Sequence, residues 1–158
     1  MFIFTIKGKV KAKQSVKFGR NGIKYTPADV KEYANYVKWC FKETYPLWDA
    51  ERLAGKALNV FITVYCSIPK SFSKKKYKEA TAGVIRPTVK PDCDNIAKNI
   101  CDALNGVAYP DDRQIVSLII AKHYTICEER VIVEIKAEDT EKVERRLLGL
   151  EGQACGKA

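Results

Sequence analysis

Acidic side chains are concentrated in one short span of a chain that is otherwise basic. The segment KPDCDNIAKNICDALNG, residues 90–106, places Asp92 and Asp94 just ahead of a helical pattern, and Asp111 and Asp112 follow shortly after it. Three carboxylates that lie close together repel one another, and a divalent cation removes that repulsion. Oxygen ligands suit Mg²⁺ or Mn²⁺, which also accept phosphate oxygens. If Asp112 comes close to Asp92 and Asp94, the span predicts a metal site that acts on phosphate esters.

The same residues also have a purely structural interpretation. Asp94 or Asn95 could cap the helix, Asp92 could favour its dipole, and Lys98 could pair with Asp94 one turn away. A calcium loop of the EF-hand type is excluded, because the sixth and twelfth positions counted from Asp92 are alanines instead of glycine and glutamate. In the catalytic interpretation, Lys98 stabilises charge that develops on a phosphate oxygen or helps to orient the attacking water.

Basic side chains predict a polyanionic partner, although solubility alone could also explain the net charge of +9. Lysines at every second position of residues 7–13 would share one side of an extended segment. A second group lies in residues 70–78, where Phe72 and Tyr77 would be available to stack on bases. The lysines predicted to contact DNA are Lys11, Lys13, Lys74, Lys75, Lys76 and Lys90.

Hydrophobic spacing predicts an α/β (α+β) fold with a small mixed β-sheet of about four strands packed with helices. An Asn-Gly pair at residues 21–22 is a hairpin signal, and Thr26 and Pro27 begin a helix that Pro46 ends. The predicted strands are residues 2–6, 58–66, 114–124 and 130–136, with a short turn joining the last two. The predicted helices are residues 27–45, 71–80, 95–106 and 140–148.

The helix that follows the acidic motif is predicted to have two distinct faces. Its apolar face carries Ile96, Ile100 and Leu104 at a spacing of four residues, and this face belongs to the core. The sequence places Asp94, Lys98 and Asp102 at the same spacing on a polar stripe. The helix therefore presents candidate catalytic groups to solvent while its other side anchors it.

The length of 158 residues predicts a single domain, residues 1–150, followed by a flexible tail, residues 151–158. No stretch approaches the roughly 20 apolar residues of a membrane span, and the first residues lack the order of a secretory signal. A cytoplasmic location without a membrane partner is expected. The six cysteines form no C-x-x-C pair, which argues against structural zinc and favours free thiols.

The segment KPDCDNIAKNICDALNGVAYPDDRQIV, residues 90–116, resembles the core motif of the RusA-type Holliday junction resolvases, which are common in prophages. The shared pattern is K/R-x-D-x-D-N, a lysine four residues after the second aspartate, D-A-L-N-G, and an acidic pair followed by Q-I/V. The stretches FTIKGKVKAKQ and YTP also resemble the first strand, the basic loop and the first helix start of that family.

The resemblance implies a RusA-like, homodimeric, Mg²⁺-dependent endonuclease that nicks two strands of a four-way DNA junction symmetrically, with Mn²⁺ as a substitute metal. It assigns Asp92, Asp94 and Asp112 as catalytic metal-binding aspartates, Lys98 as the catalytic lysine, and Asp111 as a candidate for a supporting role. A junction with approximate two-fold symmetry is best matched by a two-fold dimer. Two alternatives remain open: a non-catalytic nucleic-acid-binding module, and a nuclease for other branched or duplex DNA.

Overall fold

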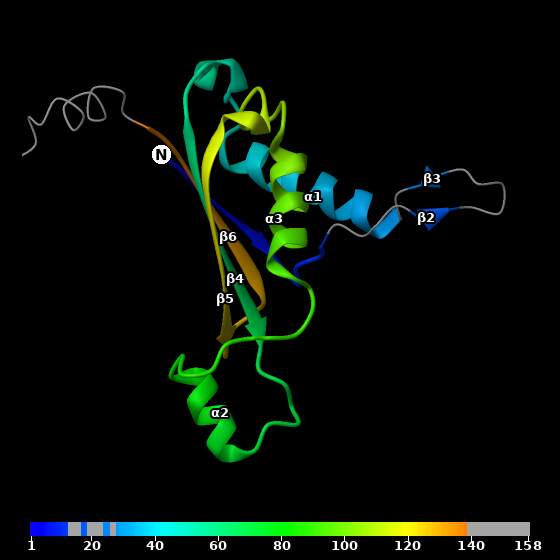
Figure 1. Cartoon of the computed structure of the whole chain (residues 1–158), viewed down its shortest axis with the longest axis vertical. Helices are drawn as coiled ribbons and strands as arrows, with labels where there is room; N and C mark the ends of the chain where they lie inside the picture. Colours follow the sequence, from blue (N-terminus) through cyan, green and yellow to red (C-terminus); the bar gives the residue numbers. More distant parts are fainter. Residues whose placement is uncertain (13–16, 19–23, 26–27, 139–158) are drawn as a thin grey trace, which may run out of the picture.

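A mixed four-stranded sheet is the centre of the computed structural model, which describes residues 1–12, 17–18, 24–25 and 28–138 (Figure 1). The strand order is β1–β6–β4–β5, in which β4 and β5 are parallel and the other neighbours are antiparallel. The predicted α/β class with about four strands is therefore confirmed. The strands of this sheet are β1 (Phe2–Lys7), β4 (Leu58–Ser67), β5 (Ile115–Thr125) and β6 (Arg130–Ala137).

Two main helices pack on the same face of the sheet and against each other (Figure 1). They are α1 (Ala28–Thr44), which contacts β1, and α3 (Cys93–Leu104), which contacts β5. A shorter helix, α2 (Lys74–Thr81), lies beyond the end of the sheet. The remaining elements are the 3₁₀ helices η1 (Ala50–Leu53) and η2 (Asp112–Gln114) and a two-stranded pair, β2 (Lys17–Phe18) and β3 (Lys24–Tyr25).

Several predictions lie outside the described residues. The antiparallel pairing of β2 with β3 agrees with a hairpin, but the Asn-Gly turn that was predicted to join them is not described. The same holds for Lys13, for the helix start at Thr26 and Pro27, for the helix at 140–148 and for the tail at 151–158. The end of the first helix is described, and α1 stops at Thr44, ahead of Pro46.

The last two strands follow one another in the chain but are not neighbours in the sheet. β4 lies between β5 and β6 and forms hydrogen bonds with both. Its sequence, LNVFITVYCS, is a nearly continuous apolar run, which suits a central strand. Because β5 is parallel to β4, the chain must cross over between them, and α3 is part of that crossover. The crossover fixes where the acidic motif stands.

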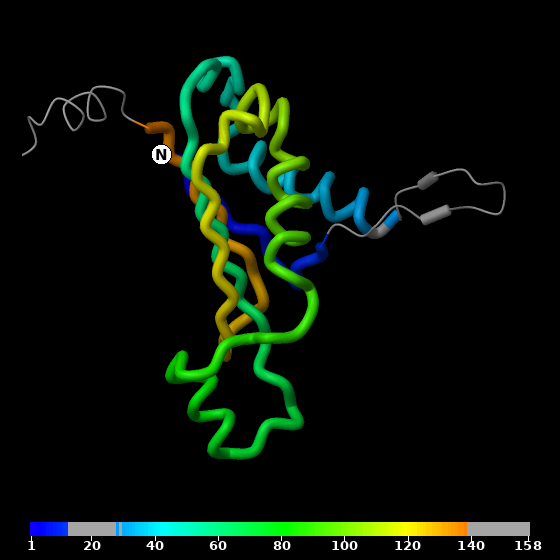
Figure 2. Tube along the Cα trace, in the orientation of Figure 1, coloured from blue at the N-terminus to red at the C-terminus, as the bar shows by residue number. Residues whose placement is uncertain are grey.

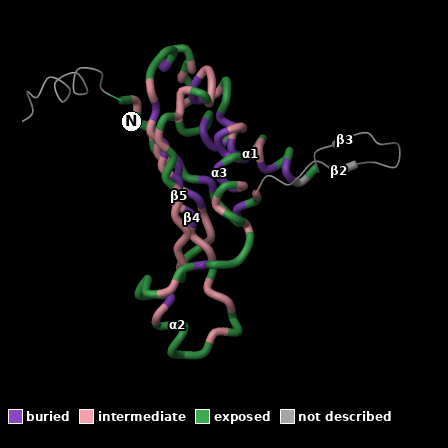
Figure 3. Tube along the Cα trace, in the orientation of Figure 1, coloured by how far each residue is buried: buried purple, intermediate pink, exposed green. Residues whose placement is uncertain are grey.

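One face of the sheet is buried under the helices. On β4 the buried side chains are every second residue from Leu58 to Val64, and α3 supplies Ile96, Ile100 and Leu104, which are fully buried (Figure 3). The predicted core face of this helix is confirmed, and so is its polar stripe, where Asp94 and Lys98 are exposed. None of the helices in the described ranges has the length and hydrophobicity to cross a membrane.

Candidate active site

The start of α3 carries two exposed carboxylates. Asp92 occupies the N-cap position but its side chain makes no capping hydrogen bond, and Asp94 lies in the first turn. The helix begins at Cys93, slightly earlier than predicted, so the prediction that Asp94 or Asn95 caps it is wrong. Both carboxylates stand at the positive end of the helix dipole, which stabilises negative charge there. Neither carboxylate is therefore used to cap the helix.

The loop that delivers Asp92 is held by a lysine from β5. Lys122 Nζ donates hydrogen bonds to the carbonyl oxygens of Val89 (2.6 Å) and Pro91 (3.0 Å), directly before Asp92. Lys122 was not among the residues predicted from the sequence. The available signal was a lysine inside the otherwise apolar run VSLIIA-K of β5. Lys122 therefore fixes the C-terminal part of β5 beside the acidic motif.

A second anchor joins α3 to the N-terminal basic segment. Asn99 is the buried polar residue of the described core, and its Nδ2 donates to the carbonyl oxygen of Lys11 at 2.9 Å. Lys9 and Lys11 are exposed on either side of the buried Val10, whereas Lys7 ends β1. The prediction of lysines on one side is thus supported for Lys9 and Lys11. Asn99 was also missed, although an asparagine between buried positions of a helix is a recognisable signal.

The two aspartates of the acidic pair after α3 are both half-buried, and they have different positions in η2. Asp111 caps η2: its side chain accepts from the backbone N–H of Arg113 (2.9 Å), and the Gln114 side chain returns to the Asp111 N–H (3.3 Å). The guanidinium of Arg113 also binds the Asp111 carboxylate at 2.6 Å. These contacts with Arg113 lower the pKa of Asp111 to about 2. Asp111 therefore shapes the turn, and Asp112 begins η2.

The segment η2, which begins with Asp112, stands at the opposite end of α3 from the helix start that carries Asp92 and Asp94 (Figure 2). The 12 residues of α3 span about 18 Å at 1.5 Å per residue. Near the far end, burial and the neighbouring carboxylates of Asp102 and Asp112 raise the pKa of the Cys101 thiol to about 11. Among the described residues, no three His, Cys, Asp or Glu side chains are grouped so that they could hold a metal ion.

The expectation that Asp112 approaches Asp92 and Asp94 is therefore wrong within one chain. The physical reason is the crossover: α3 runs in one direction and β5 returns in the other, so the residues that precede β5 lie a full helix length from the start of α3. Sequence proximity suggested a compact cluster, but the rigid rod of the helix separates its two ends.

The basic helix α2 lies toward the same end of the molecule as the start of α3 (Figure 1). Its lysines 74–76 are exposed, as is Lys90. Phe72 does not match its predicted stacking role, because its ring packs on Tyr124 of β5 (5.6 Å between centroids). Lys76 Nζ also lies 4.2 Å from the centroid of the Phe72 ring. Tyr77 remains exposed. The helix thus presents cations near the acidic motif, while Phe72 attaches it to the sheet.

Comparison with known proteins adds a family match and a relative. The family model described as "Endodeoxyribonuclease RusA" matches residues 7–136. This span contains α3, η2, β4 and β5, all of β6 except its last residue, and only the last residue of β1. The chain is also similar to "Uncharacterized protein YqaN" of Bacillus subtilis (strain 168). The two are 39% identical over 112 residues, which cover 70% of this chain and 75% of that protein.

Proposed function

Because the chain belongs to the RusA endodeoxyribonuclease family, it is an endodeoxyribonuclease that resolves Holliday junctions, and we propose that it works as a Mg²⁺-dependent homodimer whose active sites are shared between two copies. The observation that carries this proposal is the separation of Asp112 from Asp92 and Asp94 within one chain. Each copy would contribute Asp92 and Asp94 to one site and Asp112 to the other.

The donor set fits a hard divalent cation in its chemistry. Asp92 and Asp94 are exposed carboxylates at a helix N-terminus, and carboxylate oxygens are the ligands that Mg²⁺ and Mn²⁺ prefer. Asp112 of a second copy supplies the third carboxylate. A two-fold axis is required, because only such an axis delivers both Asp112 residues to the two acidic motifs at once. The same symmetry presents two equivalent sites to two equivalent strands of a junction.

The remaining residues of the site hold and stabilise the DNA. Lys98 lies one turn beyond Asp94 on the exposed stripe, where its ammonium stabilises charge on the phosphate under attack. The α2 lysines contact neighbouring phosphates, and Lys122 keeps the loop before Asp92 in place. A bound Mg²⁺ would supply Lewis-acid polarisation of the phosphate and a more acidic water.

Mixing two inactive variants tests the shared site directly. Asp94→Asn and Asp112→Asn should each abolish junction cleavage as homodimers. In a heterodimer of the two, one site combines the intact Asp94 of one copy with the intact Asp112 of the other, and the second site carries both changes. We therefore expect the mixture to regain cleavage at one strand per junction, measured by nicking of a labelled synthetic junction in Mg²⁺.

Restored nicking identifies a site built from two chains. If each site were contained in one chain, each of the two sites in the heterodimer would carry one of the two substitutions and would be inactive. If the mixture stays inactive after the subunits have demonstrably exchanged, the shared site is wrong. A matched control mixes Asp92→Asn with Asp94→Asn, which belong to the same motif and should not complement each other. Junction binding by Asp94→Asn should persist, since removing a negative charge beside phosphates reduces repulsion.

A further inference from the structure

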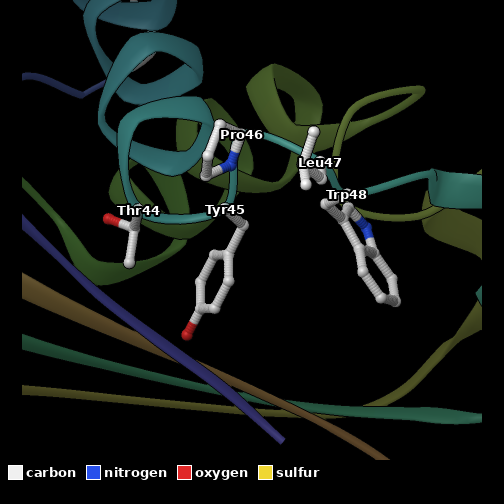
Figure 4. Close-up of a pocket in the computed structure, with 5 residues that line it drawn as sticks. All are labelled: Thr44, Tyr45, Pro46, Leu47 and Trp48. Carbon is white, nitrogen blue, oxygen red and sulfur yellow. The ribbon is translucent and has the colours of Figure 1, made fainter.

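One face of the sheet is covered by α1 and α3, and the loop after α1 extends this cover to the edge strand β1. Residues 44–48 line a pocket there, and the Tyr45 ring points toward β1 (Figure 4). The Tyr45 hydroxyl accepts a hydrogen bond from the Ile3 N–H (2.8 Å) and donates one to the Ile3 carbonyl (3.0 Å). Trp48 packs on Phe2 with 4.3 Å between the ring centroids. This side of the sheet is therefore closed from α3 to β1.

The opposite face has no comparable cover among the described residues, and we call it the open face. On β4 its side chains are every second residue from Asn59 to Tyr65, and all of them are half-buried. The sheet register arranges the middle of the open face in two rows, which are Ile3, Glu134, Phe61 and Ile119, and then Thr5, Ile132, Thr63 and Ala121. Ile3 and Ile119 are 43% and 53% exposed. An exposed apolar patch of this kind marks a surface that another element or molecule covers.

The described part of the chain ends beside the open face. The backbone N–H of Glu138, its last residue, donates a hydrogen bond to the carbonyl oxygen of Ala57 (2.8 Å). The Glu138 side chain accepts one from Asn59 Nδ2 (3.3 Å), and Asn59 belongs to the open face. Residues 139–158 therefore continue from a point at which the chain already contacts this surface.

The sequence that follows Glu138 has the pattern of an amphipathic helix. In the helix predicted at residues 140–148, Val143 and Leu147 are four residues apart, and Leu150 continues the stripe three residues later. Leu148 lies about 100° around such a helix from Leu147, which puts it outside this stripe. The pattern thus predicts one apolar side that needs a surface to pack on.

We propose that residues 140–150 pack on the open face of the same chain and cover Phe61, Ile119 and Ile132. Nine helical residues span about 13 Å at 1.5 Å per residue, and the distance from β6 across β4 to β5 is about 10 Å. Two extended residues reach about 7 Å, which brings the chain from the end of β6 to the near side of a helix packed on the sheet. The length and starting point of the segment therefore suit this position.

The chemistry of the open face favours a segment of protein over DNA. Glu134 lies in the row that also holds Phe61, and its carboxylate would repel phosphates. The nearby Lys136 is already engaged, because its Nζ lies 2.6 Å from Glu134 Oε1 and 5.1 Å from the centroid of the Phe61 ring. A separate molecule would also compete with a segment that is tethered to the same face, and tethering raises the effective concentration to the order of millimolar.

The test measures how fast a maleimide labels Ile132→Cys in the full chain. Trypsin releases residue 132 in the peptide 131–136, which contains no native cysteine, so mass spectrometry reads this position alone. Adding Leu147→Asp should raise the labelling rate about tenfold or more, because a charge in the apolar stripe detaches the segment. The matched control Leu148→Asp introduces the same charge one residue later and should leave the rate unchanged.

Thermal melts of chains that keep Ile132 test the same contact if the cysteine variant does not fold. Leu147→Asp should lower the midpoint of unfolding by about 3 °C or more, whereas Leu148→Asp should not. Equal effects of the two substitutions overturn the proposal. Labelling that is insensitive to Leu147→Asp and is slowed only by a higher protein concentration or by added junction DNA assigns the open face to a second copy or to DNA, and also overturns it. The mixed-variant test of the shared site does not depend on these outcomes.

Discussion

Four aspartates that are close in sequence have different surroundings in the structure. Asp92 and Asp94 are exposed at a helix start, and Asp92 caps nothing. Asp111 is engaged by Arg113 and by the backbone of η2, whereas Asp112 is half-buried and begins η2. At the scale of single residues, the structure therefore separates three candidate metal ligands from one carboxylate that shapes a turn.

Lys98→Ala should reduce single-turnover cleavage by about 10²- to 10³-fold, the usual loss when one group that stabilises transition-state charge is removed. The fold should be unaffected because Lys98 lies on the exposed stripe. The measurement is the cleavage rate at saturating protein. Lys42→Ala, at an exposed lysine of α1, is the matched control and should cut at the wild-type rate. Near-normal cleavage by Lys98→Ala would show that this lysine is only a surface charge without a catalytic role.

Asp111 is best tested with two substitutions. Asparagine keeps an oxygen that accepts from the Arg113 N–H, whereas alanine removes the cap. If Asp111 acts by shaping η2, Asp111→Asn should retain most of the cleavage activity and Asp111→Ala should lose about tenfold or more through misplaced Asp112. Equal and complete loss in both variants would instead make Asp111 a metal ligand. Cleavage rates and junction affinity, measured separately, distinguish these results.

The pKa of Asp111 adds a pH dependence to the same pair of variants. Its folded-state pKa of about 2 lies below the ordinary value of 3.8, so the ionised group stabilises the fold above about pH 4. This contribution is lost as the pH falls from about 4 toward 2. Thermal melts of Asp111→Asn should show a weaker decline over that range than the wild type. Because the ion pair is exposed to solvent, added salt should reduce the difference.

At the scale of elements, α2 is a basic platform attached to β5 by one aromatic contact. Ser73 caps it by accepting from the Lys76 N–H, and Phe72 packs on Tyr124. The helix is short, but these two contacts fix its start and its position beside the strand that also carries Lys122. Its lysines are therefore held near the acidic motif rather than carried on an unattached loop.

Replacing Lys74, Lys75 and Lys76 with alanine should weaken binding to all forms of DNA. It should also flatten the slope of log affinity against log salt by roughly 0.9 per lost phosphate contact on duplex arms. The cleavage rate of the bound complex should change little. A control variant removes the same charge from α1 through Lys31, Lys38 and Lys42. If both triple variants weaken binding equally, net charge acts alone and α2 has no local role.

The whole molecule divides its candidate catalytic residues between two ends. The start of α3 and the helix α2 lie toward the same end, and β5 runs from the opposite end to meet them (Figure 1). The basic residues that give the net charge of +9 would bind the DNA, and the carboxylates would bind the metal ion that we propose for cleavage. One copy contains all the necessary residue types but divides them between its two ends, which is why we assign the active unit to a pair of copies.

Short-range patterns in the sequence were sufficient to predict several elements of this protein and its family. The spacing of Ile96, Ile100 and Leu104 was sufficient to orient α3, because helical periodicity depends only on neighbouring residues. The apolar run of β4 predicted its strand, and the motif of residues 90–116 indicated the family that the comparison then identified.

Only the tertiary structure decided which of these elements meet. It placed β4 between β5 and β6, and it set η2, which begins with Asp112, at the far end of α3 from Asp92. It also brought Lys122 to the acidic loop and Asn99 to the N-terminal segment. The physical reason is that strand order and the direction of a crossover depend on packing between residues far apart in the chain, which no local pattern of side chains encodes.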